Sequence, residues 1–283
     1  MLLFCACANG QGSEQGASES GPARLPESIG DNENTAEIET GTETEIPEDE
    51  AKTYDTITLG SWRNEPIEWR VLETRDENTL VISSKILALR QYHDDALSLP
   101  DWADCSLRSW LNNDFYQAAF SEKEQQAISS TLVKTPDFET EFETLYTSGS
   151  VEKTPVLIKG SEDTEDMVFC LSVEEANNYF DSAEDRIAYR IVVQQDYDYF
   201  VQVLETIDMS PEESLYYFGR YELNEETPDV WWLRSGTYVG FSGDVWVGSI
   251  TMDGDIPQGW PCGVRPAMWL QSGDVGVEIK TNE

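Results

Sequence analysis

Apolar and polar residues alternate in three short segments early in the chain, and this period of two predicts β-strands. The segments cover residues 56–60, 67–72 and 79–83. Residues 75–78 read Arg-Asp-Glu-Asn, a composition that favours a turn between the second and third segments. The folded region is therefore predicted to open with a small antiparallel meander.

Helical spacing and capping residues follow in the middle of the chain. A helix N-terminus is favoured where Ser, Thr or Asp precedes an amphipathic run, and more so where Glu comes three residues later. Four such starts are present: Asp104 or Ser106 before Leu107, Trp110 and Leu111; Ser121 with Glu124; Ser172 with Glu175 before Ala176, Tyr179 and Phe180; and Ser210 with Pro211, in a helix ending near Gly219.

Strand patterns return towards the C-terminus. Buried or alternating strands are predicted at 167–171, 230–234, 245–248, 249–252 and 263–270, with a turn at Asp253 and Gly254. The polar stretch 134–159 is predicted to be an inserted loop. Strands, then helices, then strands, without βαβ alternation, indicate an α+β class with a mainly antiparallel sheet and a few helices.

Charge and aromatic content divide the chain unevenly. It has 55 Asp and Glu against 18 Lys and Arg, a formal charge of −37 over 283 residues. Such a surface argues against nucleic acid as a partner and against adsorption to anionic lipid, and we expect a monomer. The first 53 residues hold 12 acids, 2 bases and no tryptophan. We therefore predict a disordered acidic linker over 9–53, one globular domain over 54–273 and a tail over 274–283.

The apolar start of the chain is similar to the end of a bacterial lipoprotein signal. Ala6 precedes Cys7, and small polar residues follow. We interpret residues 1–8 as the remnant of a truncated lipoprotein signal, with Cys7 as the lipidated residue. A chance apolar start with two reactive cysteines is the alternative. The expected location is the extracellular face of the bacterial membrane, with the lipid as the only membrane contact.

Five motifs, in order, carry a family resemblance. They are Glu-Pro-Ile-Glu-Trp-Arg-Val-Leu at 65–72, Cys-Ser-Leu-Arg-Ser-Trp-Leu-Asn at 105–112, Phe-Cys-Leu-Ser at 169–172, Trp-Trp-Leu-Arg-Ser at 231–235 and Gly-Val-Arg-Pro-Ala at 263–267. Over about 56–271 the chain resembles a bacterial domain family of unknown function whose members are often lipoproteins.

The two C-terminal motifs carry a weaker resemblance in fold. A Trp-rich strand with Arg-Ser, followed by a closing Gly-Val-Arg strand, looks like the formylglycine-generating-enzyme branch of the C-type-lectin-like fold. That resemblance implies a reactive cysteine pair near the C-terminus, but only Cys262 lies in this region. The oxidase activity is therefore not carried over, because function must be argued from the site.

Candidate ligand-binding residues come from the same region. Arg234 and Arg265 are candidates because guanidinium groups bind carboxylates, sulfates or sugars through paired donors. The alternative is two buried structural arginines, stacked on tryptophan and paired with an acid such as Glu68. Trp246 and Trp260 flank glycine-rich loops, where exposed indole rings would stack on sugars. Trp69, Trp110, Trp232 and Trp269 are predicted to be core residues.

Other chemistry is weakly marked. His93 is the only histidine, and we interpret it as a loop residue beside acids. Cys105 lies at a predicted helix start, where a thiolate would be favoured, but we expect a packing role. No cofactor is expected, and calcium at 181–185 is a weak alternative, because the EF-hand spacing is missing.

The expected function is a non-catalytic binding domain on a cell-surface lipoprotein, for a glycan, a peptide or a surface protein. One alternative is an enzyme, either a glycan hydrolase with unassigned carboxylates or an oxidase using Cys262. Another is a structural envelope protein. No catalytic residue and no metal site is assigned.

Overall fold

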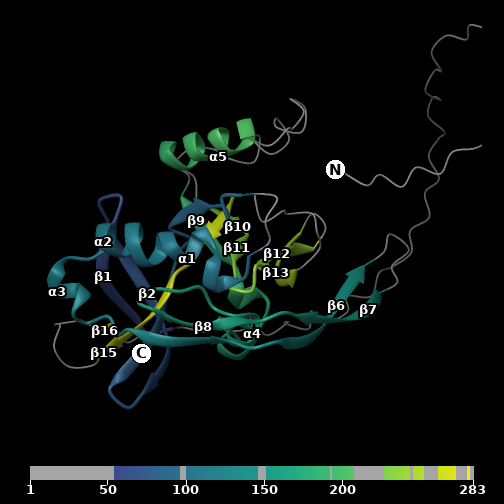
Figure 1. Cartoon of the computed structure of the whole chain (residues 1–283), viewed down its shortest axis with the longest axis horizontal. Helices are drawn as coiled ribbons and strands as arrows, with labels where there is room; N and C mark the ends of the chain where they lie inside the picture. Colours follow the sequence, from purple (N-terminus) through teal and green to yellow (C-terminus); the bar gives the residue numbers. More distant parts are fainter. Residues whose placement is uncertain are drawn as a thin grey trace, which may run out of the picture. The chain divides into compact units, whose positions relative to one another are not determined.

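The folded region of this computed structural model is built on two five-stranded sheets (Figure 1). The structure describes residues 54–95, 100–145, 151–191, 193–206, 226–242, 245–251, 261–271 and 279–280. The first sheet has the order β15-β3-β2-β1-β16 and is antiparallel throughout. Its strands are β1 (Thr56–Trp62), β2 (Glu65–Arg75), β3 (Asn78–Ser83), β15 (Ala267–Gln271) and β16 (Ile279–Lys280).

The second sheet has the order β13-β12-β11-β14-β4, with a single parallel pair, β11 with β14. Its strands are β4 (Ala88–Arg90), β11 (Trp231–Trp232), β12 (Tyr238–Ser242), β13 (Val245–Thr251) and β14 (Cys262–Val264). The predicted opening meander is confirmed by β1, β2 and β3. The predicted strand at 230–234 is only two residues long. The strands predicted at 245–248 and 249–252 are one strand, β13, over the described residues 245–251.

Two chain segments cross side by side from one sheet to the other. The predicted strand at 263–270 is wrong in one respect, because it is two strands, β14 and β15, separated by Arg265 and Pro266. β3 and β4 pair with β15 and β14 and make the same crossing. Pro266 has no N–H for a ladder, but its carbonyl accepts from the Ser83 amide. The Gly-Val-Arg-Pro-Ala motif therefore joins the two sheets.

Three two-stranded ribbons are the other paired strands of the described residues. They pair β5 (Thr131–Thr135) with β8 (Ser161–Asp166), β6 (Phe138–Leu145) with β7 (Val151–Ile158), and β9 (Ala188–Ile191) with β10 (Glu226–Asp229). The loop predicted at 134–159 is therefore wrong: most of it is the β6–β7 hairpin, which reaches away from the larger sheets (Figure 1). The polar composition of this stretch suggested a loop. A two-stranded ribbon outside the core can have polar side chains on both faces and still keep its strand pairing.

The helices are short. They are η1 (Trp102–Asp104), α1 (Ser106–Trp110), the π-helical turn η2 (Leu111–Phe115), α2 (Tyr116–Ala119), α3 (Glu122–Gln125), α4 (Val173–Tyr179), η3 (Glu184–Arg186) and α5 (Gln194–Thr206). Both capping boxes are confirmed, at Ser121 with Glu124 and at Ser172 with Glu175. The residue capping α1 is Cys105, whose sulfur accepts from the Arg108 amide, rather than Asp104 or Ser106.

The apolar segment 167–171 is buried but is not the predicted strand. The Asn112 side chain takes the place of a neighbouring strand: its Oδ1 accepts from the Met167 and Val168 amides, and its Nδ2 donates to the Val168 carbonyl. Phe169 adds an isolated antiparallel bridge to Ala267. A short apolar run does not by itself distinguish a strand from other buried backbone.

One hydrophobic core lies between these elements, with tryptophans at its centre. Trp69 and Trp232 are fully buried, as predicted, and so is Trp231. Each indole N–H donates to a backbone carbonyl. The indole N–H of Trp232 donates to the backbone carbonyl of Arg90. Trp110 and Trp269, also predicted as core, are only partly buried. The mixture of antiparallel sheets and few helices confirms the α+β class, and the C-type-lectin-like assignment stays a prediction.

Several predicted features lie outside the described residues. They are Cys7, the linker over 9–53, the helix start at Ser210, the turn at Asp253 and the whole of Trp260. Only the backbone of Trp246 is described, paired with Phe241 in β12. In the part of the chain that is described, no helix has both the length and the apolar character that crossing a membrane requires.

Candidate functional site

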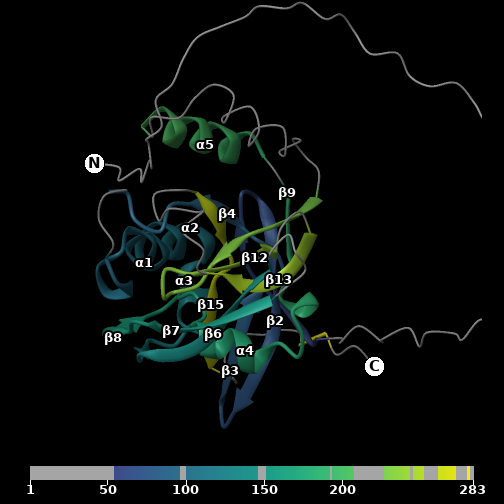
Figure 2. The same cartoon turned by 90° about the vertical axis from the view of Figure 1, so that its right-hand side faces the viewer.

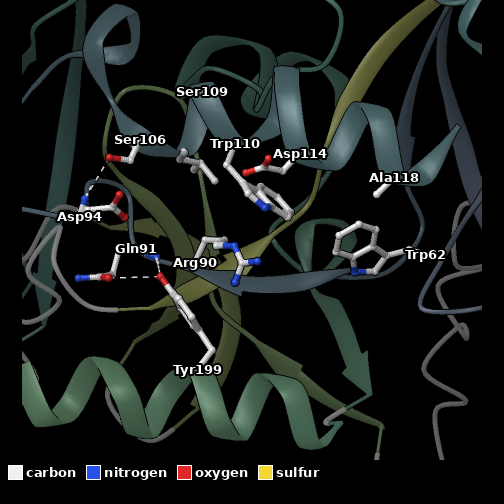
Figure 3. A pocket seen from close by; sticks show the side chains of 11 residues that line it. Trp62, Arg90, Gln91, Asp94, Ser106, Ser109, Trp110, Asp114, Ala118 and Tyr199 are labelled. Carbon is white, nitrogen blue, oxygen red and sulfur yellow. Dashed lines mark hydrogen bonds between the residues drawn. The ribbon is translucent and has the colours of Figure 1, made fainter.

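An open pocket of about 660 Å³ lies between α1, β4 and α5 (Figure 3). Its volume is within the range of small-molecule sites. Eleven residues line it: Trp62, Arg90, Gln91, Asp94, Ser106, Leu107, Ser109, Trp110, Asp114, Ala118 and Tyr199. In Figures 1 and 2, α5 lies at one end of the described domain, beyond β4 and β9. The pocket thus combines segments that are more than a hundred residues apart.

One helical face supplies four of the lining residues at intervals of four: Ser106, Trp110, Asp114 and Ala118. In an uninterrupted α-helix, positions four apart drift around the axis, because a turn holds only 3.6 residues. The π-helical turn at 111–115 adds residues to the turn and offsets this drift. The series therefore stays on the pocket side from α1 through α2.

Arg90 lies in the middle of the pocket, between two aromatic rings (Figure 3). Its Cζ is 4.6 Å from the ring centroid of Trp110 and 4.6 Å from that of Tyr199. Both contacts have the geometry of a cation–π interaction. The two rings cover the faces of the guanidinium. Its edges, toward which the N–H groups point, stay uncovered.

The cation of Arg90 has no counter-ion in the described part of the chain. One of its N–H groups, on Nη1, donates to the Leu89 carbonyl at 3.1 Å. Burial lowers the pKa of Arg90, and the nearby Arg63 cation lowers it further, whereas Tyr199, Asp196 and Asp114 oppose the change. An arginine with free donors beside a cavity is suited to bind an anion from solution.

Asp196 holds α5 against the rest of the pocket. Its carboxylate accepts two hydrogen bonds from the Arg63 guanidinium, at 2.6 and 2.8 Å, and one from the Leu89 amide. Tyr199 is three residues along α5, on the same face. Its hydroxyl accepts from the Gln91 amide and donates to the Gln91 side chain. Hydrogen bonds to Leu89, within β4, and to Gln91, which follows β4, therefore position α5 and its Tyr199 ring over Arg90.

A serine–histidine contact also lies at the pocket wall. His93 Nδ1 is 3.1 Å from Ser106 Oγ and accepts from the Ser106 amide. An acyl-transfer site also needs free N–H donors for the oxyanion. Here the amides of Ser106, Leu107 and Arg108 all have partners within the domain. The contact caps the helix and offers no oxyanion hole, in line with the interpretation of His93 as a loop residue.

Arg234 lies in the core, away from the pocket. Its guanidinium forms a bidentate pair with Glu175, at 2.6 and 2.9 Å. Its other N–H groups donate to Thr135 and to the carbonyls of Cys170 and Lys134. Ligand binding by Arg234 stays a prediction, but these contacts favour the structural alternative. The acid is Glu175, and Glu68 is exposed.

Arg265 is also fully buried and is placed differently. Its Cζ lies 5.3 Å from the ring centroid of Phe180 and 5.2 Å from that of Trp231. Nε donates to the Ser83 carbonyl, while Nη1 and Nη2 have no partner within the described residues. Burial lowers its pKa to about 9. The contact with Trp231 agrees with the stacking expected in the structural alternative, but the acidic partner of that alternative is not found among the described residues. The role of Arg265 in ligand binding stays a prediction.

The three described cysteines, Cys105, Cys170 and Cys262, are free and buried. Burial raises the pKa of Cys105 to about 11 and that of Cys262 well above its usual value. A thiolate at the start of α1 is therefore disfavoured despite its position. In the described ranges no group of three or more His, Cys, Asp or Glu side chains is placed to hold a metal ion, and this includes 181–185.

Comparison with known families shows the family of this domain. The model of one family, a domain of unknown function called DUF6273, matches residues 76–272, more than half of the chain. The chain belongs to the DUF6273 family. The matched range contains every lining residue of the pocket except Trp62, and both arginine motifs, whereas the first of the five sequence motifs lies before it. No curated protein and no solved structure matches this DUF6273 chain.

Sequence reasoning did not find this pocket. It treated Trp110 as a core residue and left Trp62, Arg90 and Tyr199 unassigned. The signal that was present is the spacing of Ser106, Trp110, Asp114 and Ala118, which places polar groups and a large ring on one helical face. Arg90 gave no signal, because an arginine at the end of a three-residue strand has no characteristic pattern.

Proposed function

We propose that this DUF6273 domain is a non-catalytic binding module whose ligand occupies the pocket at Arg90. The observation that carries the proposal is the guanidinium between Trp110 and Tyr199, with free N–H edges and no acidic partner in the described domain. A buried or half-buried cation normally has a partner. Here the open cavity gives a solute access to it.

The pocket has the composition of a recognition site. Three aromatic side chains, Trp62, Trp110 and Tyr199, provide flat apolar surface, and Ser109 and Gln91 add hydrogen-bonding groups. The satisfied amides at the start of α1 favour binding over acyl transfer. A glycan, a peptide or a surface protein remains the class of ligand, as the sequence predicts, with the site at Arg90 instead of the loops at Trp246 and Trp260.

The same proposal places the domain outside the cell. Ala6 and Cys7 resemble the lipidation site of a lipoprotein, and the linker predicted over 9–53 would separate a lipid anchor from the domain. Metabolic labelling with an alkyne fatty acid in a bacterial host tests this, with a complete lipoprotein export signal fused ahead of Ala6, because residues 1–8 resemble only the end of such a signal. We expect label on this fusion but none on its C7A variant. Label that survives in C7A would exclude Cys7 as the anchor.

The binding module is tested with a mixed library of neutral sugars, acidic sugars, amino acids and short peptides. Saturation-transfer NMR on the full chain should detect at least one bound compound, with the signal lost in R90M and kept in R75M. Arg75 is a matched control, because it also lies over a tryptophan ring, that of Trp269, but outside the pocket. Binding that is equal in R90M, or a compound that is chemically converted, would overturn the proposal.

A further inference from the structure

The charges that line the pocket do not match a simple anion. Beside the cation of Arg90, two carboxylates line the cavity, Asp94 and Asp114. Neither forms an ion pair within the described residues, and Arg63, a second cation near Arg90, is paired with Asp196. The lining therefore carries one positive and two negative charges on an already acidic protein. A ligand with negative charge alone would gain from Arg90 but would be repelled by its neighbours.

The two carboxylates of the pocket, Asp94 and Asp114, lie to the side of the Arg90 guanidinium and form no ion pair with it. Asp114 follows Trp110 by one turn of the same helical face, and Trp110 covers one face of Arg90. Figure 3 shows Asp94 beside Ser106 and Gln91 on one side of the guanidinium, and Asp114 beside Trp110. A small ligand bound to the edge of Arg90 would thus meet an acceptor for a positive group close by.

The aromatic lining adds a third requirement. Trp62 and Trp110 pack edge to face, with ring centroids 5.8 Å apart. The indole N–H of Trp62 is buried and has no hydrogen-bond partner in the described part of the chain. The rings of Trp62 and Trp110 provide flat apolar surface beside the Arg90 guanidinium. Surface of this kind favours a ligand with a flat or bulky apolar part.

We propose that the pocket binds a zwitterion, a free amino acid or short peptide whose carboxylate pairs with Arg90 and whose ammonium group pairs with Asp114 or Asp94. The carboxylate approaches the guanidinium edge, because Trp110 and Tyr199 cover its two faces. The ammonium group compensates the acidic lining, and the apolar side chain lies against Trp62 and Trp110. The inference rests on the proposed binding function and assigns its ligand class.

Calorimetric titration of the full chain tests the inference with L-phenylalanine and two derivatives that each lack one charge. N-acetyl-L-phenylalanine has no ammonium group, and L-phenylalaninamide has no carboxylate. We expect both to bind at least about tenfold more weakly than L-phenylalanine, because each loses a charge-assisted hydrogen bond. Glucuronate, an acidic sugar without an ammonium group, should bind as weakly.

Variants assign each charge to its residue. D114N combined with D94N should weaken L-phenylalanine by about tenfold or more and leave N-acetyl-L-phenylalanine unchanged or tighter. R90M should weaken L-phenylalanine and leave L-phenylalaninamide unchanged. The matched controls are D163N, at an exposed position within β8, and R75M; both should bind all three compounds like the wild type. Circular dichroism melting shows whether each variant is folded.

The outcomes separate this inference from the proposed function. Glucuronate or N-acetyl-L-phenylalanine binding as tightly as L-phenylalanine, with loss in R90M, would show an anion site; the zwitterion assignment would then fail while the binding function stood. No binding of L-phenylalanine would also overturn the assignment. If in addition no library compound depends on Arg90, the proposed function fails with it.

Discussion

The guanidinium of Arg234, in the turn between β11 and β12, and the carboxylate of Glu175 form a bidentate ion pair that links this turn to the N-terminus of α4. Glu175 also accepts from the Ser172 amide, so one carboxylate completes a helix cap and neutralises a buried cation. The Arg234 carbonyl accepts from the buried Tyr92 hydroxyl. The Trp-Trp-Leu-Arg-Ser motif therefore carries a structural contact that spans about 60 residues of sequence.

Replacing Glu175 should destabilise the domain strongly. E175Q leaves the buried Arg234 cation without a full counter-charge. Because the Glu175 side chain is 32% exposed, we expect a cost of about 1.5–3 kcal/mol. Urea unfolding followed by tryptophan fluorescence measures the loss. E174Q is the matched control, since Glu174 is the exposed neighbour in the same helical turn. Equal stability of the two variants would contradict the role given to the pair.

Arg265 should tolerate an apolar replacement far better than Arg234. Two of its nitrogen atoms have no partner within the described residues, so R265M removes unsatisfied donors and keeps a long side chain between Phe180 and Trp231. Replacing a poorly compensated buried charge is often neutral or stabilising, and we expect a change in unfolding free energy below about 1 kcal/mol. R234M, measured in parallel, should lose several times more. A larger loss in R265M than in R234M would reverse this assignment.

Local sequence signals predicted local structure well. The capping boxes at Ser121 and Ser172 depend on residues only three positions apart, so the pattern and the structure contain the same contact. The same holds for the turn before Asn78. The segment at 167–171 failed because the partner of its backbone is the side chain of Asn112, which no strand pattern encodes.

The pocket was beyond prediction for a related reason. Arg90, Trp110 and Tyr199 meet only because β4, α1 and α5 are brought together by pairings between segments far apart in the chain. The bidentate contact of Arg63 with Asp196 spans 133 residues, and neither residue belongs to a recognisable motif. Sequence patterns thus drew attention to Arg234 and Arg265, as ligand-binding candidates with a structural alternative, whereas Arg90 emerged only from the tertiary arrangement.

The Cys105 thiol should make stability depend on pH in the alkaline range. Burial raises its pKa to about 11 from an ordinary value of 9.0. Below pH 9 the thiol is protonated in both the folded and unfolded states, so its contribution is fully present. Between pH 9 and 11 only the unfolded state ionises, and roughly 2–3 kcal/mol is lost as pH rises.

The difference in unfolding free energy between wild type and C105S isolates this contribution, because other titrating groups cancel. Serine keeps an acceptor for the Arg108 amide but does not ionise in this range. We expect the wild type to lose stability relative to C105S from pH 9 to 11. A pH-independent difference would show that the thiol ionises equally in both states.

The carboxylate of Asp196 should control the local stability of α5 and, through it, the pocket. D196N weakens both hydrogen bonds from Arg63 and the one from the Leu89 amide, of which the charge-assisted ones contribute about 1.5–3 kcal/mol each. Amide exchange in α5 should accelerate roughly tenfold for each 1.4 kcal/mol lost, while β2 and β3 stay protected. D198N is the control two residues along, at an exposed position of the same helix.

The same substitution should act on ligand binding. Because Tyr199 covers Arg90 from α5, D196N should also weaken the binding of any ligand that depends on Arg90, and D198N should not. If D196N leaves the exchange of α5 unchanged, contacts other than this carboxylate hold the helix in place.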